Sequence, residues 1–176
     1  MAKVLDEFRQ RIPGASVVIA GGAARDAQIG RVPKDFDVFA LGTSAEALTG
    51  AARLSDLERV ESNLEWHKSE PGLVATVRWR EVEVQVIASA CASLPDLLDT
   101  FDWSVSLYGF DGAIVAHPLA ALPVHGEHLK LNRVTYPYST MRRGYRFSER
   151  YGMRLRPLDV RRIAEHFTSV DGAASA

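Results

Sequence analysis

"VVIAGGAARDAQIGRVPKDFDVFALG", residues 17–42, is the stretch that decides the fold. Residues 16–20 form a short apolar run, rich in β-branched side chains, which predicts a buried strand ending at the pair Gly21-Gly22. The following residues predict a short helix that ends at Gly30. Residues 35–41 predict a second strand. The segment therefore indicates a strand, a glycine turn, a helix and a second strand.

Two carboxylates, Asp35 and Asp37, stand at the start of that second strand. Because side chains alternate along a strand, both point to the same face. Neighbouring carboxylates repel each other unless a positive charge lies between them, and Mg²⁺ suits hard oxygen ligands of this kind. In the alternative interpretation, Asp35 only caps or turns the loop after Pro33 and Asp37 is solvated.

The glycine pair adds a second feature to this interpretation. Without Cβ atoms, Gly21 and Gly22 allow backbone N–H groups to approach a ligand closely, and the start of the next helix favours an anion. The spacing matches neither a P-loop nor a dinucleotide-binding GxGxxG motif. Glycines also serve tight turns, but with the two aspartates nearby this pair indicates a phosphate cradle beside a metal site.

A third carboxylate is expected for two-metal phosphoryl chemistry. Glu81, Glu83 and Gln85 alternate along a predicted strand over residues 82–88, so they share one face. Glu83 is the favoured ligand because it lies inside the strand, whereas Glu81 belongs to the predicted turn. A simply solvated strand face remains the alternative, and Asp102 is the next candidate for the ligand.

The remaining sequence predicts an α+β fold in which helices flank a mixed sheet. Thr43 and Glu46 resemble a capping box that opens a helix over residues 44–60, and Ser93 with Asp96 predicts a helix through Leu98. The other expected elements are a helix over 3–12, hairpins formed by 73–79 with 82–88 and by 103–110 with 113–117, and helices over 139–153 and 157–167.

Composition narrows the function classes. The chain has 176 residues and a net charge of −1, but residues 130–162 contain ten basic and only two acidic side chains, so a local basic face can meet a polyanion. Cys91 is the single cysteine, which fits a reducing compartment. No apolar run approaches the roughly 20 residues of a membrane span. We therefore expect a cytoplasmic protein with no membrane contact.

The first segment resembles a known motif. Residues 18–39 are similar to the first motif of the polymerase-β-type nucleotidyltransferases, above all the head domain of the tRNA CCA-adding and poly(A) polymerase family, whose pattern is GGxVRDxLLGRxxxDxD. The residues in register are Gly21, Gly22, Arg25, Asp26, Gly30, Arg31, Asp35 and Asp37. Two later segments are similar more loosely: residues 101–112 resemble the strand RDFTINALAYD, with Asp102 on its aspartate, and residues 142–155 resemble the helix LRAxRFAxxLGF, with Arg143 and Arg146 on its arginines.

The resemblance implies a metal-dependent nucleotidyltransferase that moves an NMP from an NTP to an acceptor hydroxyl and releases pyrophosphate. Two Mg²⁺ ions are expected on Asp35, Asp37 and Glu83. Gly21 and Gly22 are expected to hold the β- and γ-phosphates of the nucleotide, and Arg25, Arg143 and Arg146 to neutralise the charge of its triphosphate. With Asp26 and Asp102, the full set of expected nucleotide-binding residues is Gly21, Gly22, Arg25, Asp26, Asp102, Arg143 and Arg146.

The departures from the family pattern concern base selection and the acceptor. The positions of the family's EDxxR template for CTP and ATP carry Tyr136, Pro137 and Thr140. An RNA 3′ end is the expected acceptor, and a protein partner could supply acceptor binding. The alternatives are NMP transfer to a protein or small-molecule hydroxyl, and a catalytically silent nucleotide- or RNA-binding subunit. The expected organisation is a head domain over 1–135, a helical, neck-like extension over 136–168 and a disordered tail over 169–176.

Overall fold

The computed structural model describes residues 1–60 and 72–171. The chain divides into two compact units. The first contains Met1–Leu98 and Tyr108–Ala116, and the second contains Asp99–Leu107 and the chain from His117 onward. Residues 117–135, which the sequence analysis placed with the head, are therefore grouped with the C-terminal helices.

The first unit is built on a seven-stranded mixed sheet with the order β3-β4-β5-β2-β1-β6-β7. All neighbouring strands are antiparallel except β2 and β5, which are parallel. This confirms the expected α+β class with a mixed sheet. The strands are β1 (Ser16–Ala20), β2 (Asp35–Leu41), β3 (Glu58–Arg59), β4 (Leu73–Trp79), β5 (Val82–Ser89), β6 (Tyr108–Phe110) and β7 (Ile114–Ala116).

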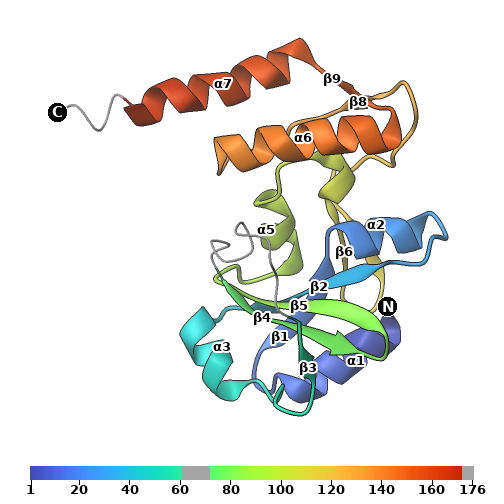
Figure 1. The fold of residues 1–176 in the computed structure, drawn as a ribbon, viewed down its shortest axis with the longest axis vertical. Coiled ribbons are helices and arrows are strands. Elements are labelled where there is room, and N and C mark those ends of the chain that lie inside the picture. Colours follow the sequence, from blue (N-terminus) through green and yellow to red (C-terminus); the bar gives the residue numbers. More distant parts are fainter. Residues whose placement is uncertain (61–71, 172–176) are drawn as a thin grey trace. The chain divides into compact units, whose positions relative to one another are not determined.

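Among the described residues of this unit, four helices flank the sheet, with α1 and α3 on one side and α2 and α5 on the other (Figure 1). The apolar face of α1 buries Val4, Leu5 and Phe8, as the helical spacing predicts. The β-branched residues of β1, β2 and β5 complete the core, with Ile19, Val38, Val84 and Val86 fully buried. The helices are α1 (Ala2–Arg11), α2 (Gly22–Gln28), α3 (Ala45–Ala51) and α5 (Leu94–Asp99).

The third helix differs from the sequence prediction. The structure ends α3 at Ala51, where a helix over 44–60 was expected, and Glu58–Arg59 pairs with β4 as strand β3. The cap is Ser44 and not Thr43, because the Ser44 hydroxyl accepts the hydrogen bond from the Ala47 amide. Tertiary pairing at the sheet edge thus overrides the weak helical preference of residues 52–60.

The tight turn between β4 and β5 confirms the predicted hairpin. Trp79 pairs with Val82, so Arg80 and Glu81 form a two-residue turn, and both have positive φ angles, 47° and 69°. A two-residue turn with two positive φ angles twists in the same sense as the strands that it joins. Asn and Gly are the usual residues there, so this turn is held by the hairpin and not by its own sequence.

The second unit packs its helices around the indole of Trp103, which is fully buried. Gly144 allows this packing, since a Cβ there would lie 2.5 Å from Trp103 Cζ2. The indole Nε1–H donates to the Thr140 carbonyl at 2.8 Å. The elements are the 3₁₀ helix η1 (Ser104–Ser106), α6 (Pro137–Tyr151), α7 (Pro157–Asp171) and the parallel strand pair β8 (His128–Leu129) and β9 (Arg154–Leu155).

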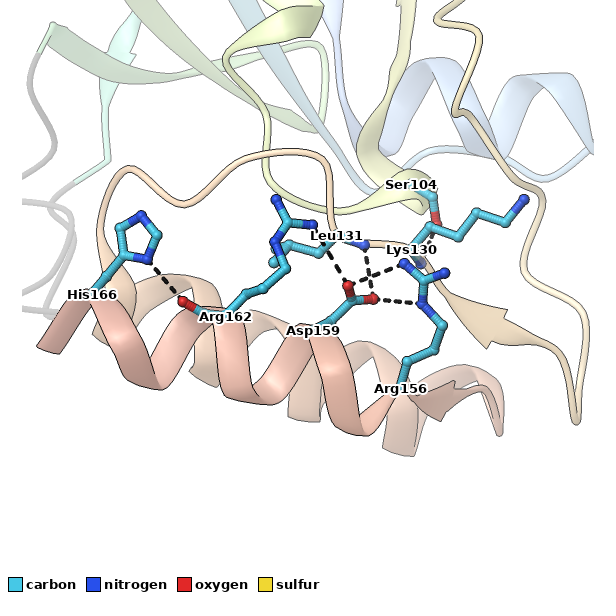
Figure 2. Close-up of polar contacts among 7 residues, drawn as sticks. All are labelled: Ser104, Lys130, Leu131, Arg156, Asp159, Arg162 and His166. Atoms are coloured by element: carbon cyan, nitrogen blue, oxygen red, sulfur yellow. Dashed lines mark hydrogen bonds and ion pairs between the residues drawn. The ribbon is translucent and has the colours of Figure 1, made fainter.

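A buried carboxylate ties α7 to the loop after β8 (Figure 2). Asp159 accepts from the Leu131 amide at 3.3 Å and from Arg156 Nε at 2.7 Å, and Arg162 Nη1 lies 3.8 Å away. The ion pair with Asp159 raises the pKa of Arg156. Because Asp159 is almost fully enclosed, these contacts satisfy a charge that would otherwise be costly to bury.

The two C-terminal helices follow the expected boundaries closely. Helix α6 ends at Tyr151 and is capped by Gly152, which adopts the left-handed conformation with φ 61°. Helix α7 continues to Asp171, so residues 169–171 belong to the helix, and residues 172–176 of the expected tail lie outside the described residues.

Among the described residues, no helix combines the length and apolar character needed to cross a membrane.

Candidate functional site

The register of β2 and β5 brings the predicted carboxylates together. In this parallel pair, Asp35 lies opposite Glu83 and Asp37 lies opposite Gln85. Paired residues of neighbouring strands share a face, so all four side chains project from the same side of the sheet. Asp35 is exposed, and Asp37 and Glu83 are partly exposed, so the group is open to a ligand.

The glycine turn lies at the same end of the sheet as these carboxylates. Ala20, the last residue of β1, pairs with Asp37 in the antiparallel ladder. Gly21 and Gly22 therefore leave the sheet beside the start of β2, and β5 starts at the same end because it runs parallel to β2. The fold thus gathers the elements of the predicted site although 46 residues of sequence separate Asp37 from Glu83.

Gly21 is required by the backbone itself. Its φ of 83° and ψ of −133° fall in a region that only glycine adopts readily. Its N–H donates to the Tyr108 carbonyl at 2.7 Å, so this amide is already used inside the fold. Gly22 differs, because it is the first residue of α2 and a Cβ there would meet only Arg25 Nη2, at an ordinary contact distance of 3.6 Å.

Arg25 and Asp26 form a buried ion pair directly below the glycine turn. Arg25 is only 3% exposed, and its Nε and Nη2 donate to Asp26 Oδ1 at 2.9 and 2.7 Å. The Arg25 guanidinium lies beside Gly22 within the protein, and its contact with a triphosphate stays a prediction. Burial raises the pKa of Tyr108, and the positive charge of Arg25 opposes this effect.

The carboxylate group suits a magnesium ion that shares its ligands with a nucleotide. In residues 1–60 and 72–171, no three His, Cys, Asp or Glu side chains form a group ready to hold a metal ion. Magnesium is commonly bound by one or two carboxylates, with waters and substrate phosphates as its other ligands. The pair Asp35 and Asp37 meets that requirement, and Glu83 stays the predicted third ligand.

The second unit holds the other predicted nucleotide-binding residues. Arg143 Nε and Nη2 both lie 2.7 Å from Asp102 Oδ2. Asp102 is buried, and this burial raises the pKa of its carboxyl even though the nearby Arg143 charge lowers it. Arg146, one turn further along α6, is exposed. Asp102 and Arg143 thus form one group, which the sequence analysis had placed in separate motifs.

The three template positions have different environments. Thr140 is almost completely buried, so its hydroxyl is not presented to a nucleobase. Pro137 is the first residue of α6 and has no amide hydrogen. Tyr136, the residue before the helix, is 51% exposed and is the most exposed of the three, since Pro137 is only partly exposed.

Some features of the site give no signal in the sequence. The Tyr108 carbonyl that holds the Gly21 amide comes from β6, far along the chain, and pairing between β1 and β6 cannot be read from composition. Arg78 lies beside Glu83 on β4, and its guanidinium pairs with Glu58 of β3 at 3.4 Å. The predicted hairpin with its two-residue turn at Arg80 and Glu81 already places Arg78 opposite Glu83, but the pairing with Glu58 could not be predicted, because residues 58–59 were expected in a helix.

Comparison with solved structures identifies the fold. No protein-family model and no curated protein matches the sequence. The chain is similar to "tRNA-processing enzyme (apo form I)" with a TM-score of 0.60 and 16% identity, over 96% of this chain and 46% of that one. It is similar to a "CCA-adding enzyme with ATP" with a TM-score of 0.58 and 17% identity, over 94% of this chain and 43% of that one. It is also similar to a "tRNA nucleotidyltransferase complexed with a primer tRNA and an incoming ATP analog" with a TM-score of 0.55 and 17% identity, over 95% of this chain and 50% of that one.

The chain therefore has the polymerase-β-like nucleotidyltransferase fold, as the sequence analysis expected. At these identities the likeness concerns the fold, and the chain spans about half the length of the structures that it matches.

Proposed function

We propose that this protein is a metal-dependent nucleotidyltransferase that moves an NMP from an NTP to the 3′ hydroxyl of an RNA and releases pyrophosphate. One observation carries the proposal: Asp35 and Asp37 project from one face of β2, in register with Glu83 and Gln85, beside a glycine turn. A solvated strand face has no need of aligned carboxylates, whose mutual repulsion is relieved by a bound cation.

In this proposal, Asp35 and Asp37 hold Mg²⁺ and Glu83 supplies a further oxygen. When bound, two such ions supply Lewis-acid polarisation of the phosphate and the acceptor hydroxyl. Gly22 allows the triphosphate to approach the backbone closely, because its Cα carries no side chain that would intervene. Arg25 acts as a positioning residue, since its buried guanidinium packs beside Gly22 and fixes Asp26.

The proposed acceptor follows from charge and from the similar structures. Residues 130–162 carry ten basic side chains and two acidic ones, which favours a polyanionic ligand. Similar structures have been solved with CTP and with ATP, and one has a primer tRNA. These ligands belong to other proteins, but together with the basic run they favour an RNA acceptor over a neutral small molecule.

The test is incorporation of label from each of the four α-³²P NTPs. Purified protein is incubated with Mg²⁺ and either total RNA, RNase-treated lysate or a protein-free small-molecule fraction. We expect label on RNA, dependent on Mg²⁺ and absent in Asp35→Asn. Label on protein or on a small molecule would identify a different acceptor for the same chemistry. Labelling of none of the three would contradict the enzymatic proposal.

A further inference from the structure

Helix α6 presents two tyrosines to solvent on one line of its surface. Tyr138 is 71% exposed and Tyr145 is 58% exposed. They are seven residues apart, which is about two helical turns and roughly 10 Å along the axis. Arg142 lies between them, four residues after one and three before the other, so the three side chains are surface neighbours.

This face has a positive charge. Arg142, Arg146 and Arg150 are all exposed on α6, and the Arg150 guanidinium lies over the Tyr151 ring at 5.3 Å. Within the described part of the chain, neither Arg142 nor Arg146 has a carboxylate within ion-pair distance, whereas Arg143, on the inner side, is paired with Asp102. Glu149 is the one acidic side chain of the helix. The outer face therefore combines exposed aromatic rings with unpaired guanidinium groups.

A hollow continues this face toward the end of the helix. It has a volume of about 300 Å³ and is lined by Arg146, Phe147, Glu149 and Arg150. Phe147 packs against the core cluster around Trp103 and against Tyr151, so the charged side chains Arg146, Glu149 and Arg150 give the hollow its character. Tyr138, Arg142 and Tyr145 lead along the helix to this hollow.

The rings and charges match one kind of partner. Exposed tyrosine costs helix propensity compared with Lys, Glu or Ala, so a face that only kept the protein soluble would not favour it. Aromatic rings at intervals stack on successive bases, and arginines between them meet the phosphates that join those bases. A nucleic-acid duplex hides its base faces, so only a single strand can use both features.

We infer that the outer face of α6, formed by Tyr138, Arg142, Tyr145 and Arg146, binds single-stranded RNA. The choice of RNA rests on the proposed function, in which this face holds the strand that leads to the acceptor 3′ end. Binding of a strand to this face does not depend on transfer, so a variant without transfer activity still tests it.

The experiment measures binding of the full chain to a fluorescein-labelled single-stranded RNA of about 12 nucleotides, a length within the range of single-strand sites. In Tyr138→Ala/Tyr145→Ala we expect Kd to rise at least about tenfold, because loss of one stacked base alone corresponds to that change. Tyr138→Phe/Tyr145→Phe keeps both rings and should bind within about threefold of the unmodified protein. Phe167→Ala, which removes an exposed aromatic ring from α7, is the matched control and should have no effect.

Salt dependence supplies a second readout. Arg142→Ala should weaken binding and reduce the slope of log K against log salt by about 0.7, the value for one phosphate contact on a single strand. Arg161→Ala on α7 is the control, since that side chain is exposed and paired with Glu165. Unchanged affinity of the double alanine variant, equal binding to duplex RNA, or no binding of single strands by the unmodified protein would each overturn the inference. Loss of transfer with binding intact would count against the proposed function only.

Discussion

Asp35 of β2 and Glu83 of β5 are direct register partners in neighbouring parallel strands, so two carboxylates face the same side of the sheet. Like charges placed opposite each other destabilise a sheet by a few tenths of a kcal/mol to about 1 kcal/mol. Asp37 follows on the same face two residues later. In the proposed function, a cation bound here would offset this cost, and the first two predictions test that relationship.

The first prediction concerns the two aspartates of β2. Asp35→Asn or Asp37→Asn should lower transfer by more than about 100-fold, since even changes to the partners of metal ligands cost 10- to 100-fold. The free energy of unfolding in metal-free buffer should hold or rise, because each change relieves like-charge repulsion. Labelled-NTP incorporation and chemical denaturation measure the two quantities. A variant that unfolds, or that keeps full activity with Mg²⁺, would contradict the assignment.

The second prediction compares two glutamates that are close in sequence. Glu83 lies inside β5 opposite Asp35, whereas Glu81 lies in the turn with a φ of 69°. Glu83→Gln should therefore reduce activity by at least about tenfold, and Glu81→Gln should leave it unchanged. Initial rates at saturating Mg²⁺ provide the comparison. An equal loss in both variants would mean that Glu83 is not the third ligand.

The third prediction separates the two glycines of the turn. Gly21→Ala should destabilise the protein by about 1–3 kcal/mol, because its φ of 83° and ψ of −133° are accessible to glycine alone. Gly22→Ala should leave stability unchanged or raise it by up to about 1 kcal/mol, since Gly22 is helical and a Cβ there meets only Arg25 at 3.6 Å.

At Gly22, the affinity for an NTP should fall although the stability of the protein does not. If a triphosphate approaches this backbone, Gly22→Ala should weaken NTP binding by about tenfold, or 1.4 kcal/mol, in a protein that is as stable as the original. Calorimetric titration with Mg²⁺ and an NTP measures the affinity. Unchanged affinity would mean that the glycine pair serves the turn and not a ligand.

The opening segment shows what sequence patterns can predict. The strands Ser16–Ala20 and Asp35–Leu41, and the place of Glu83 inside a strand, follow from side-chain period and β-branched content. Strand order does not follow from these patterns. Strands β2 and β5 are neighbours in the sheet, but residues 42–81, which include β4, the hairpin partner of β5, lie between them in the sequence. Their parallel pairing depends on packing of the whole sheet.

Side-chain partners were harder to predict than strands. Arg25 reads in sequence as an available cation, but the fold encloses it with Asp26. Thr43 and Ser44 are both plausible caps, and only the backbone geometry selects Ser44. Local sequence specifies which residues can fill these roles, and tertiary packing decides which of them do.

The fourth prediction concerns the buried pair of the second unit. Because the folded-state pKa of Asp102 is raised, the native state loses stability as pH rises from the ordinary carboxyl value through the folded pKa, and the loss stays constant above it. Removal of Arg143 takes away a charge that lowers this pKa, so the loss should grow. Arg143→Gln should therefore cost about 1–2 kcal/mol near neutral pH, at the lower end for a buried unpaired charge because Arg143 is partly exposed.

The pH profile of that variant identifies the cause. The difference in unfolding free energy between Arg143→Gln and the original protein should shrink as pH falls below the raised pKa of Asp102, because the folded carboxyl then carries a proton in both proteins. Chemical denaturation between about pH 4 and pH 8 measures it. In an Asp102→Asn background the pH-dependent part should disappear. A cost that is independent of pH in both backgrounds would assign the effect to packing alone.

The last prediction concerns base selection. Of the three template positions, Thr140 is buried, Pro137 has no amide donor, and Tyr136 presents an exposed ring. None can offer the paired carboxylate and guanidinium that read the edge of a base, whereas a tyrosine ring can stack on any base. The four NTPs should therefore bind with affinities within about tenfold of one another, or about 1.4 kcal/mol. Calorimetric titration with α,β-linked non-hydrolysable analogues and Mg²⁺ measures this spread. Tyr136→Ala should weaken the binding of all four NTPs by a similar factor. Tyr136→Phe, which keeps the ring, is the control. A strict preference for CTP and ATP would instead show that other residues have replaced the template, and tRNA-end synthesis would become the leading function.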